Sequence, residues 1–172
     1  MKNIEQPNEQ LDYDFLKKGL LSGDISAKEV HLKLLAADQK SGTHEAAHTN
    51  LFFLEDVDVQ NYIRTQPENI QYTYMRFLGF TQWHIAQNCM FEGKEAEGLE
   101  LFKQSVQNSI AGNADESWIA YGEGTIAYLQ KDVEGLKAAI AKEKASDKNR
   151  AILERMLARI DKGEEPDYKL DY

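Results

Sequence analysis

The sequence predicts an all-helical protein, and three observations support that fold class. Proline, which interrupts helices, occurs only at Pro7, Pro67 and Pro166. Ala, Leu and Glu, which favour helices, occur 17 times each, whereas the strand-favouring Val occurs five times. Apolar residues recur at steps of three and four along most of the chain, and the alternation typical of strands is hard to find. We therefore expect seven or eight helices.

The chain before Pro67 predicts short, irregular helices. Apolar residues at helical spacing favour a helix over residues 11–22, which ends at a turn around Gly23. Ser26 and Glu29 have the spacing of a capping box, in which each side chain accepts a hydrogen bond from the other's backbone amide. A second helix therefore begins there. Thr43 and Asp56 are candidate caps of two further short helices.

Longer helices follow Pro67. The run from Glu68 to Phe91 is rich in aromatic residues and contains one potential breaker, Gly79, before the turn at Gly93. The helix after Gly93 is expected to end at Gly112. Asp115 can cap the next helix, which ends at a turn near Lys131 and is followed by a further helix. The last helix runs from near Asp147 to Lys162.

The length and composition are those of one globular domain covering residues 1–172. The chain is 42% apolar and 28% charged, which suits a single core. Residues 1–67 hold the short helices and residues 68–163 the regular stack. Residues 164–172, EEPDYKLDY, read as a tail that is loose or draped over the surface.

Charge and cysteine content exclude several classes of function. The formal net charge of −9 would repel nucleic acid phosphates and anionic membranes, so neither is an expected partner. The single cysteine, Cys89, can form no internal disulfide bond, which argues against a disulfide-stapled secreted protein. The first ten residues lack the apolar core of a signal peptide, and no long apolar run occurs, so we expect a cytoplasmic protein.

An internal repeat relates two predicted helical hairpins. A shift of 37 positions superposes Glu97-Gly98-Leu99 on Glu134-Gly135-Leu136 and Phe91 on Tyr128. Each hairpin then has a glycine in its second helix, where the lack of a side chain lets the first helix approach closely. We expect Gly98 and Gly135 to mark these two close approaches.

The first hairpin resembles the tetratricopeptide repeat over residues 80–145. Ala86 precedes the Gly93 turn, and Gly98 and Phe102 follow it. In the tetratricopeptide family, small residues lie at the closest helix crossing and an aromatic residue follows one turn later, which is the pattern that these three residues resemble. The chain departs from the family in its period of 37 in place of 34, and in Glu123 and Ala139, which replace the small and aromatic residues in the second copy.

The resemblance implies antiparallel hairpins stacked in a short right-handed array. It also implies a concave face, lined by the first helix of each pair, that binds a peptide or a partner protein. Transferred residue by residue, the partner-binding positions of the first copy are Phe80, Trp83, Gln87 and Met90. Those of the second copy are Ser117, Ala120, Gly124 and Ala127, which are small and carry no charge.

One short motif suggests a different function. His44-Glu45-Ala46-Ala47-His48 matches HExxH, in which two histidines one helical turn apart coordinate zinc and the glutamate activates a metal-bound water. Glu68 is a candidate third ligand. Against this reading, Thr43 places the motif in the first turn of its helix, where Glu45 is an ordinary partner for the helix dipole.

The favoured interpretation is a non-catalytic adaptor or scaffold that binds a protein or peptide and needs no cofactor. The alternative is a zinc-dependent hydrolase that uses His44, His48 and Glu45. Two hairpins rarely suffice for a stable repeat array. The amino-terminal helices are therefore expected to complete or cap the stack, and an aromatic-rich face could also support a homodimer.

Overall fold

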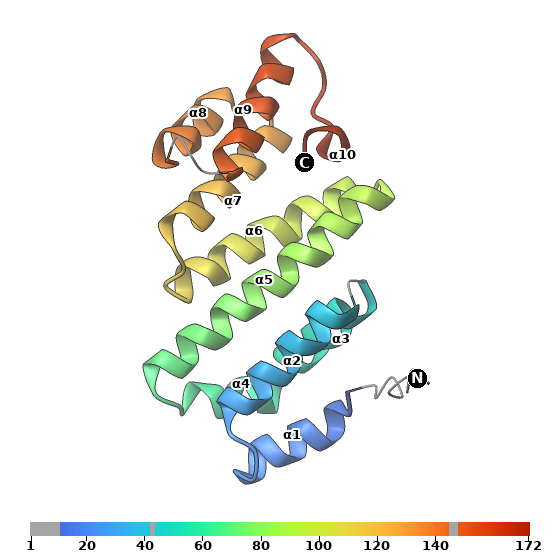
Figure 1. The fold of residues 1–172 in the computed structure, drawn as a ribbon, viewed down its shortest axis with the longest axis vertical. Coiled ribbons are helices and arrows are strands. Elements are labelled where there is room, and N and C mark those ends of the chain that lie inside the picture. Colours follow the sequence, from blue (N-terminus) through green and yellow to red (C-terminus); the bar gives the residue numbers. More distant parts are fainter. Residues whose placement is uncertain (1–10, 42–43, 145–147) are drawn as a thin grey trace, which may run out of the picture.

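The computed structural model describes residues 11–41, 44–144 and 148–172, and these residues form ten α-helices and no strand (Figure 1). The all-helical fold class is confirmed, with ten helices among the described residues in place of the expected seven or eight, one of them in the tail. The helices are α1 (Tyr13–Ser22), α2 (Ala27–Ser41), α3 (His44–Glu55), α4 (Val57–Arg64), α5 (Glu68–Glu92), α6 (Glu95–Ala111), α7 (Glu116–Leu129), α8 (Val133–Lys142), α9 (Lys148–Asp161) and α10 (Tyr168–Asp171).

The predicted helix starts are confirmed where the structure describes them. The Ser26 backbone amide donates to Glu29 Oε2 at 3.0 Å, and the Glu29 amide donates to Ser26 Oγ at 3.2 Å, which completes the capping box of α2. Asp56 caps α4 and Asp115 caps α7 through their side chains. Thr43 lies outside the described residues.

The longest helix, α5, contributes to two large hydrophobic clusters and to a small third one, in which Ile85 and Cys89 contact Ala47. Its amino-terminal half contributes Phe77 and Leu78 to a cluster formed with α1–α4. Its carboxy-terminal half contributes Trp83 and Met90 to a cluster formed with α6–α10. Figure 1 shows α5 and α6 crossing the middle of the molecule, with α1–α4 on one side and α7–α10 on the other.

Helices α5 and α6 form the tightest hairpin, and small residues line their contact. A Cβ atom added at Gly79 would lie 2.8 Å from the backbone oxygen of Ser105, and one added at Gly98 would lie 3.0 Å from that of Ala86. The Ser105 hydroxyl also donates to the Gly79 carbonyl at 2.6 Å. The helix axes can approach this closely only because these positions carry little or no side chain.

Helices α7 and α8 form a second hairpin whose ends lie at the expected offset from those of α5 and α6. A shift of 37 carries the end of α5 onto the end of α7, and the start of α6 onto the residue before α8. Gly98 lies against Met90 and the Ala86 backbone oxygen, whereas Gly135 lies against its own cap, Asp132, and against Ala127, the position equivalent to Met90. The internal repeat itself stays a prediction.

Helix α9 packs against α7 and α8 and covers the small residues of the second hairpin. Leu153 is fully buried, and a Cβ atom at Gly124 would lie 2.8 Å from its side chain. Gly124, one of the small residues expected to line a groove in the second copy, is therefore covered by α9. Among the described residues, no helix combines the length and the apolar character needed to cross a bilayer.

We predict that Gly79→Ala destabilises the protein, because its new methyl group would meet the Ser105 backbone. Overpacking of this kind costs about 1–3 kcal/mol, and the better helix propensity of alanine returns less than about 1 kcal/mol. A net loss of about 1–2 kcal/mol should appear in urea denaturation. Gly98→Ala is the comparison, since its nearest neighbour is the flexible Met90 sulfur at 2.7 Å. A larger loss for Gly98→Ala would contradict this account.

Candidate functional site

The most elaborate polar site holds the chain's own C-terminal segment, residues 164–172. Helix α10 packs on α5 and α9, and the C-terminus lies beside the end of α5 (Figure 1). Tyr168 is 2% exposed, and its hydroxyl accepts a hydrogen bond from Gln87 Nε2 at 2.9 Å. The ring of Tyr168 lies 5.4 Å from Phe102 and 6.0 Å from Phe91, centroid to centroid. This tyrosine is the apolar anchor of the segment.

A second anchor is Asp171, which is also buried. Its carboxylate accepts a hydrogen bond from the Tyr128 hydroxyl at 2.5 Å and one from Arg159 Nε at 2.6 Å. The Tyr128 hydroxyl in turn accepts the backbone amide hydrogen of Asp167 at 2.6 Å. Burial, followed by the hydrogen bond to Asp171, raises the pKa of the Tyr128 phenol, so it stays protonated and remains a donor.

Complementary charge surrounds the segment. Arg159 also pairs with Glu164 at 2.9 Å, Lys131 pairs with Glu165, and Arg155 donates to the backbone oxygen of Asp171 at 3.0 Å. Acidic side chains of the segment thus face basic side chains from α9 and from the turn between α7 and α8. Charge-assisted hydrogen bonds of this kind are the stronger ones in proteins.

The local sequence explains how the chain reaches this site. Gly163 adopts a left-handed φ of +75° after α9, which turns the chain back along the helix. Asp167 then caps α10, because its side chain accepts the backbone amides of Lys169 and Leu170 at 3.0 and 3.3 Å. Of the two expectations for residues 164–172, the loose tail is wrong, because the segment lies on α5 and α9 and is held there by two buried side chains and several ion pairs.

The structure buries three of the four residues predicted to bind a partner. Trp83 is enclosed by the rings of Phe102 and Trp118, with centroids 4.4 and 5.1 Å away. Met90 packs against Gly98, and Gln87 contacts the tail. An open groove over Trp83 and Gln87 does not exist in this chain, because α7 covers the tryptophan and the C-terminal segment covers the glutamine.

The fourth predicted residue, Phe80, stays half-buried. It lies in a shallow cleft of about 410 Å³ whose lining includes Trp118 and Arg76. Its ring is 4.2 Å from that of His84 and 6.3 Å from that of Trp118. Aromatic rings thus continue from this open cleft, through the buried Trp83, towards the C-terminal segment.

A second cleft, of about 450 Å³, borders the C-terminal segment itself. It lies between the α5–α6 turn, the α7–α8 turn and residues 165–169. Met90, Leu99 and Leu129 contribute apolar surface to it, and Lys131 contributes a positive charge. The segment therefore fills only part of the space between the two turns.

The residues of the zinc alternative are not brought together with Glu68. Ala47, the neighbour of His48, packs with Ile85 and Cys89 near the far end of α5. Glu68 begins that helix, so it lies about 26 Å along the axis from Ile85 at the α-helical rise of about 1.5 Å per residue. Glu68 instead accepts a hydrogen bond from the Tyr72 hydroxyl at 2.5 Å. Glu68 therefore does not complete a site with His48.

The rest of the HExxH motif is only partly described. Helix α3 begins at His44, so the motif occupies the first turn of its helix as expected, and His48 is exposed. The side chains of His44 and Glu45 lie outside the described residues, so the metal-binding pair stays a prediction. Within the part of the chain that the structure describes, no group of three potential ligands converges on a metal position.

The lone cysteine is not placed as a nucleophile. Cys89 is 5% exposed, and burial raises the pKa of its thiol, which disfavours the reactive thiolate.

We compared the chain with protein-family models, curated proteins and solved structures, and none of these three comparisons found a match.

Sequence reasoning missed Tyr128, Arg159, Tyr168 and Asp171 as parts of one site. The signal available in the sequence was the cap and aromatic pattern of Asp167 and Tyr168 after Pro166, which indicates a short helical turn. Nothing in that pattern specifies which surface the turn contacts. Arg159 and Tyr128 are recognisable only once α7 and α9 are placed side by side.

We predict that Tyr128→Phe loosens the C-terminal segment, because it leaves Asp171 and the Asp167 amide each without one hydrogen-bond partner. The expected loss of stability is about 1–3 kcal/mol, with faster amide hydrogen exchange in residues 167–172. Tyr72→Phe is the matched control, since its hydroxyl contacts only the exposed Glu68 and should be worth less than about 0.5 kcal/mol. Equal effects of both variants would contradict the assigned role of Tyr128.

Proposed function

We propose that this protein is a non-catalytic adaptor or scaffold that binds a protein or peptide. Its binding surface is the one, built from α5, α7 and α9, on which residues 164–172 lie. The single observation that carries the proposal is the contact pattern of this segment, which buries Tyr168 and Asp171 one helical turn apart. A partner segment with the same spacing of aromatic and acidic side chains would find the same contacts.

The chemistry of the surface supports a defined class of partner. Gln87 and the surrounding rings suit an aromatic side chain with a hydroxyl group, while Tyr128 and Arg159 suit a carboxylate. Lys131 and Arg155 add positive charge along the segment. The preferred partner is therefore an acidic peptide with a Tyr-x-x-Asp turn, bound in a short helical conformation.

The arrangement of the hairpins supports the proposed likeness to tetratricopeptide repeats. Two helix pairs follow each other at a 37-residue interval, and glycines lie at equivalent close contacts. In such arrays the first helix of each pair lines the binding face, and here α5 and α7 supply Gln87 and Tyr128. The stack would be short, with α9 in the place of a third first helix.

The proposal includes the setting in which binding occurs. We place binding in the cytoplasm and expect a partner other than nucleic acid or a membrane, because the acidic net charge disfavours anionic partners. Exchange of residues 164–172 between two copies would use the same contacts in trans, which provides a route to a homodimer.

A peptide-binding experiment tests the proposal. The full-length double variant Tyr168→Ala, Asp171→Ala should release its own segment and bind a fluorescent peptide of residues 164–172 in fluorescence anisotropy. Wild type should bind the peptide at least about 10-fold more weakly, because its own segment competes at an effective concentration in the millimolar range.

Two controls make this result specific. A peptide with alanine at both anchor positions should not bind, and Arg159→Ala in the released background should weaken binding about 10-fold or more. Binding should also decline as salt rises, since several of the contacts are exposed ion pairs. A folded double variant that does not bind the wild-type peptide would contradict the proposal.

Metal analysis separates the adaptor proposal from the hydrolase alternative. We expect purified protein to carry less than stoichiometric zinc, and chelation to leave its thermal stability unchanged, because the proposed function has no metal step. His48→Ala is the control. Stoichiometric zinc that disappears in this variant would favour the hydrolase with His44, Glu45 and His48.

A further inference from the structure

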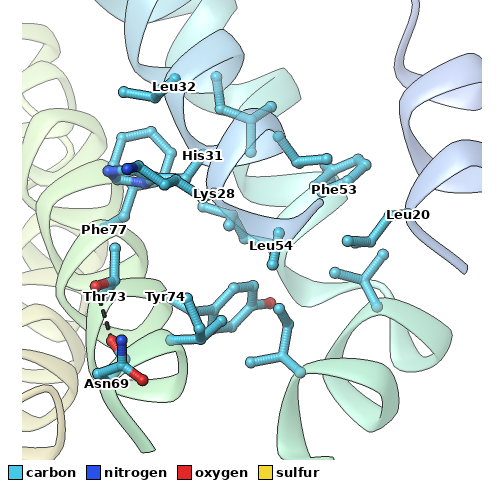
Figure 2. Close-up of a pocket in the computed structure, with 16 residues that line it drawn as sticks. Leu20, Lys28, His31, Leu32, Phe53, Leu54, Asn69, Thr73, Tyr74 and Phe77 are labelled. Atoms are coloured by element: carbon cyan, nitrogen blue, oxygen red, sulfur yellow. Dashed lines mark hydrogen bonds between the residues drawn. The ribbon is translucent and has the colours of Figure 1, made fainter. Parts of the chain in front are cut away.

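A separate cavity of about 330 Å³ lies in the amino-terminal half of the molecule, where α1–α5 meet (Figure 2). It shares no lining residue with the contacts of the C-terminal segment. Well-packed cores contain few voids larger than a water molecule. A cavity of about 150 Å³ already accommodates benzene, and ligand sites start at about 300 Å³. This cavity therefore has room for a small organic molecule of about two rings.

Its walls are mainly apolar. Figure 2 shows Leu54, Phe53 and Leu20 on one side and Phe77 on the other, with Tyr74 extending across the floor of the view. The apolar lining residues come from α1, α2, α3, α4 and α5, so the cavity lies where these helices meet. They are Leu20, Ala27, Val30, Leu32, Leu34, Phe53, Leu54, Val59, Ile63, Ile70 and Phe77.

Two buried polar atoms in the lining have no hydrogen-bond partner among the described residues. They are the Tyr74 hydroxyl and Nδ1 of His31. Burial of an unpaired hydroxyl or imidazole nitrogen is costly, and such groups are nearly always paired in folded proteins. The His31 ring is held edge-on to Phe77, with centroids 4.9 Å apart and an interplanar angle of 90°. Both atoms are closed off from solvent in this structure, so a ligand oxygen would pair with either of them only after a small shift of the surrounding side chains.

The charge of the lining determines the charge of the ligand. Among the described lining residues the only fully ionised side chain is Lys28, which is exposed. Burial, with a smaller contribution from Arg76, lowers the pKa of His31, so its imidazole is neutral at pH 7. A charged group deep inside this cavity would therefore lack a partner, whereas a neutral oxygen would have the Tyr74 hydroxyl or His31 Nδ1 as a partner.

The geometry points to a binding site for a neutral, mainly apolar small molecule of about two rings that carries one hydroxyl or carbonyl oxygen. The apolar body fills the space between Leu54, Val59 and Phe77, and the oxygen pairs with the Tyr74 hydroxyl or with His31. Entry is from the side of Lys28, Leu32 and Asn69, which are the exposed lining residues. The proposal is independent of peptide binding by the C-terminal half.

An NMR titration with three matched probes tests this site. We expect 2-naphthol to bind wild type saturably, with chemical shift changes concentrated in α2 and the first half of α5. Naphthalene, which lacks the oxygen, should bind about 5- to 10-fold more weakly, since it leaves both polar atoms unpaired. The charged 2-naphthoate should bind more weakly still.

Three variants locate the contacts. Tyr74→Phe should weaken 2-naphthol about 5-fold, leave naphthalene unchanged, and preserve the fold because it removes an unpaired polar atom. Ile70→Trp, at a half-buried lining position, should fill the cavity and abolish binding of both probes. Tyr62→Phe, whose side chain is half-buried nearby but does not line the cavity, should change neither affinity.

The following results would overturn the inference. One is the absence of saturable 2-naphthol binding to folded wild type. Another is binding that survives unchanged in folded Ile70→Trp, which would place the probe elsewhere. Equal affinity for naphthalene and 2-naphthol, together with no effect of Tyr74→Phe, would show that the two polar atoms do not select the ligand.

Discussion

The close contact between α5 and α6 holds the two halves of the molecule together. A methyl group added at Gly79 or Gly98 would meet the opposing backbone or side chains, and the Ser105 hydroxyl donates a hydrogen bond across the contact. The pair forms one layer in the middle of the molecule (Figure 1). Each face of the layer then supports a separate cluster of buried side chains, one with α1–α4 and one with α6–α10.

This division explains why the two candidate sites have opposite chemistry. In the carboxy-terminal half, small residues of α7 allow α9 to pack closely, and this packing brings Tyr128 and Arg159 to the same place. In the amino-terminal half, the five helices α1–α5 meet around a cavity with mainly apolar walls. One site therefore suits an acidic peptide, and the other suits a neutral small molecule.

Local signals in the sequence were sufficient to predict most helices. A cap such as the Ser26 and Glu29 box, or Asp56 or Asp115, satisfies backbone amides within its own turn, so its effect does not depend on distant residues. The Gly98 and Gly135 contacts were predictable for a related reason, because each hairpin is formed by neighbouring segments. The accessibility of Trp83 and Gln87 was not predictable, since it depends on α7 and on a segment 81 residues further along the chain.

The helical class, the cap positions and the helical hairpins could be predicted from the sequence alone, because those features follow from interactions within a turn or between adjacent helices. Tertiary packing was needed to show which aromatic residues are exposed, where the C-terminal segment lies, and that His48, on α3, lies near the opposite end of α5 from Glu68. Those outcomes depend on how several helices pack together. Burial of a side chain by three or four neighbouring helices leaves no periodic pattern in the sequence of any single helix.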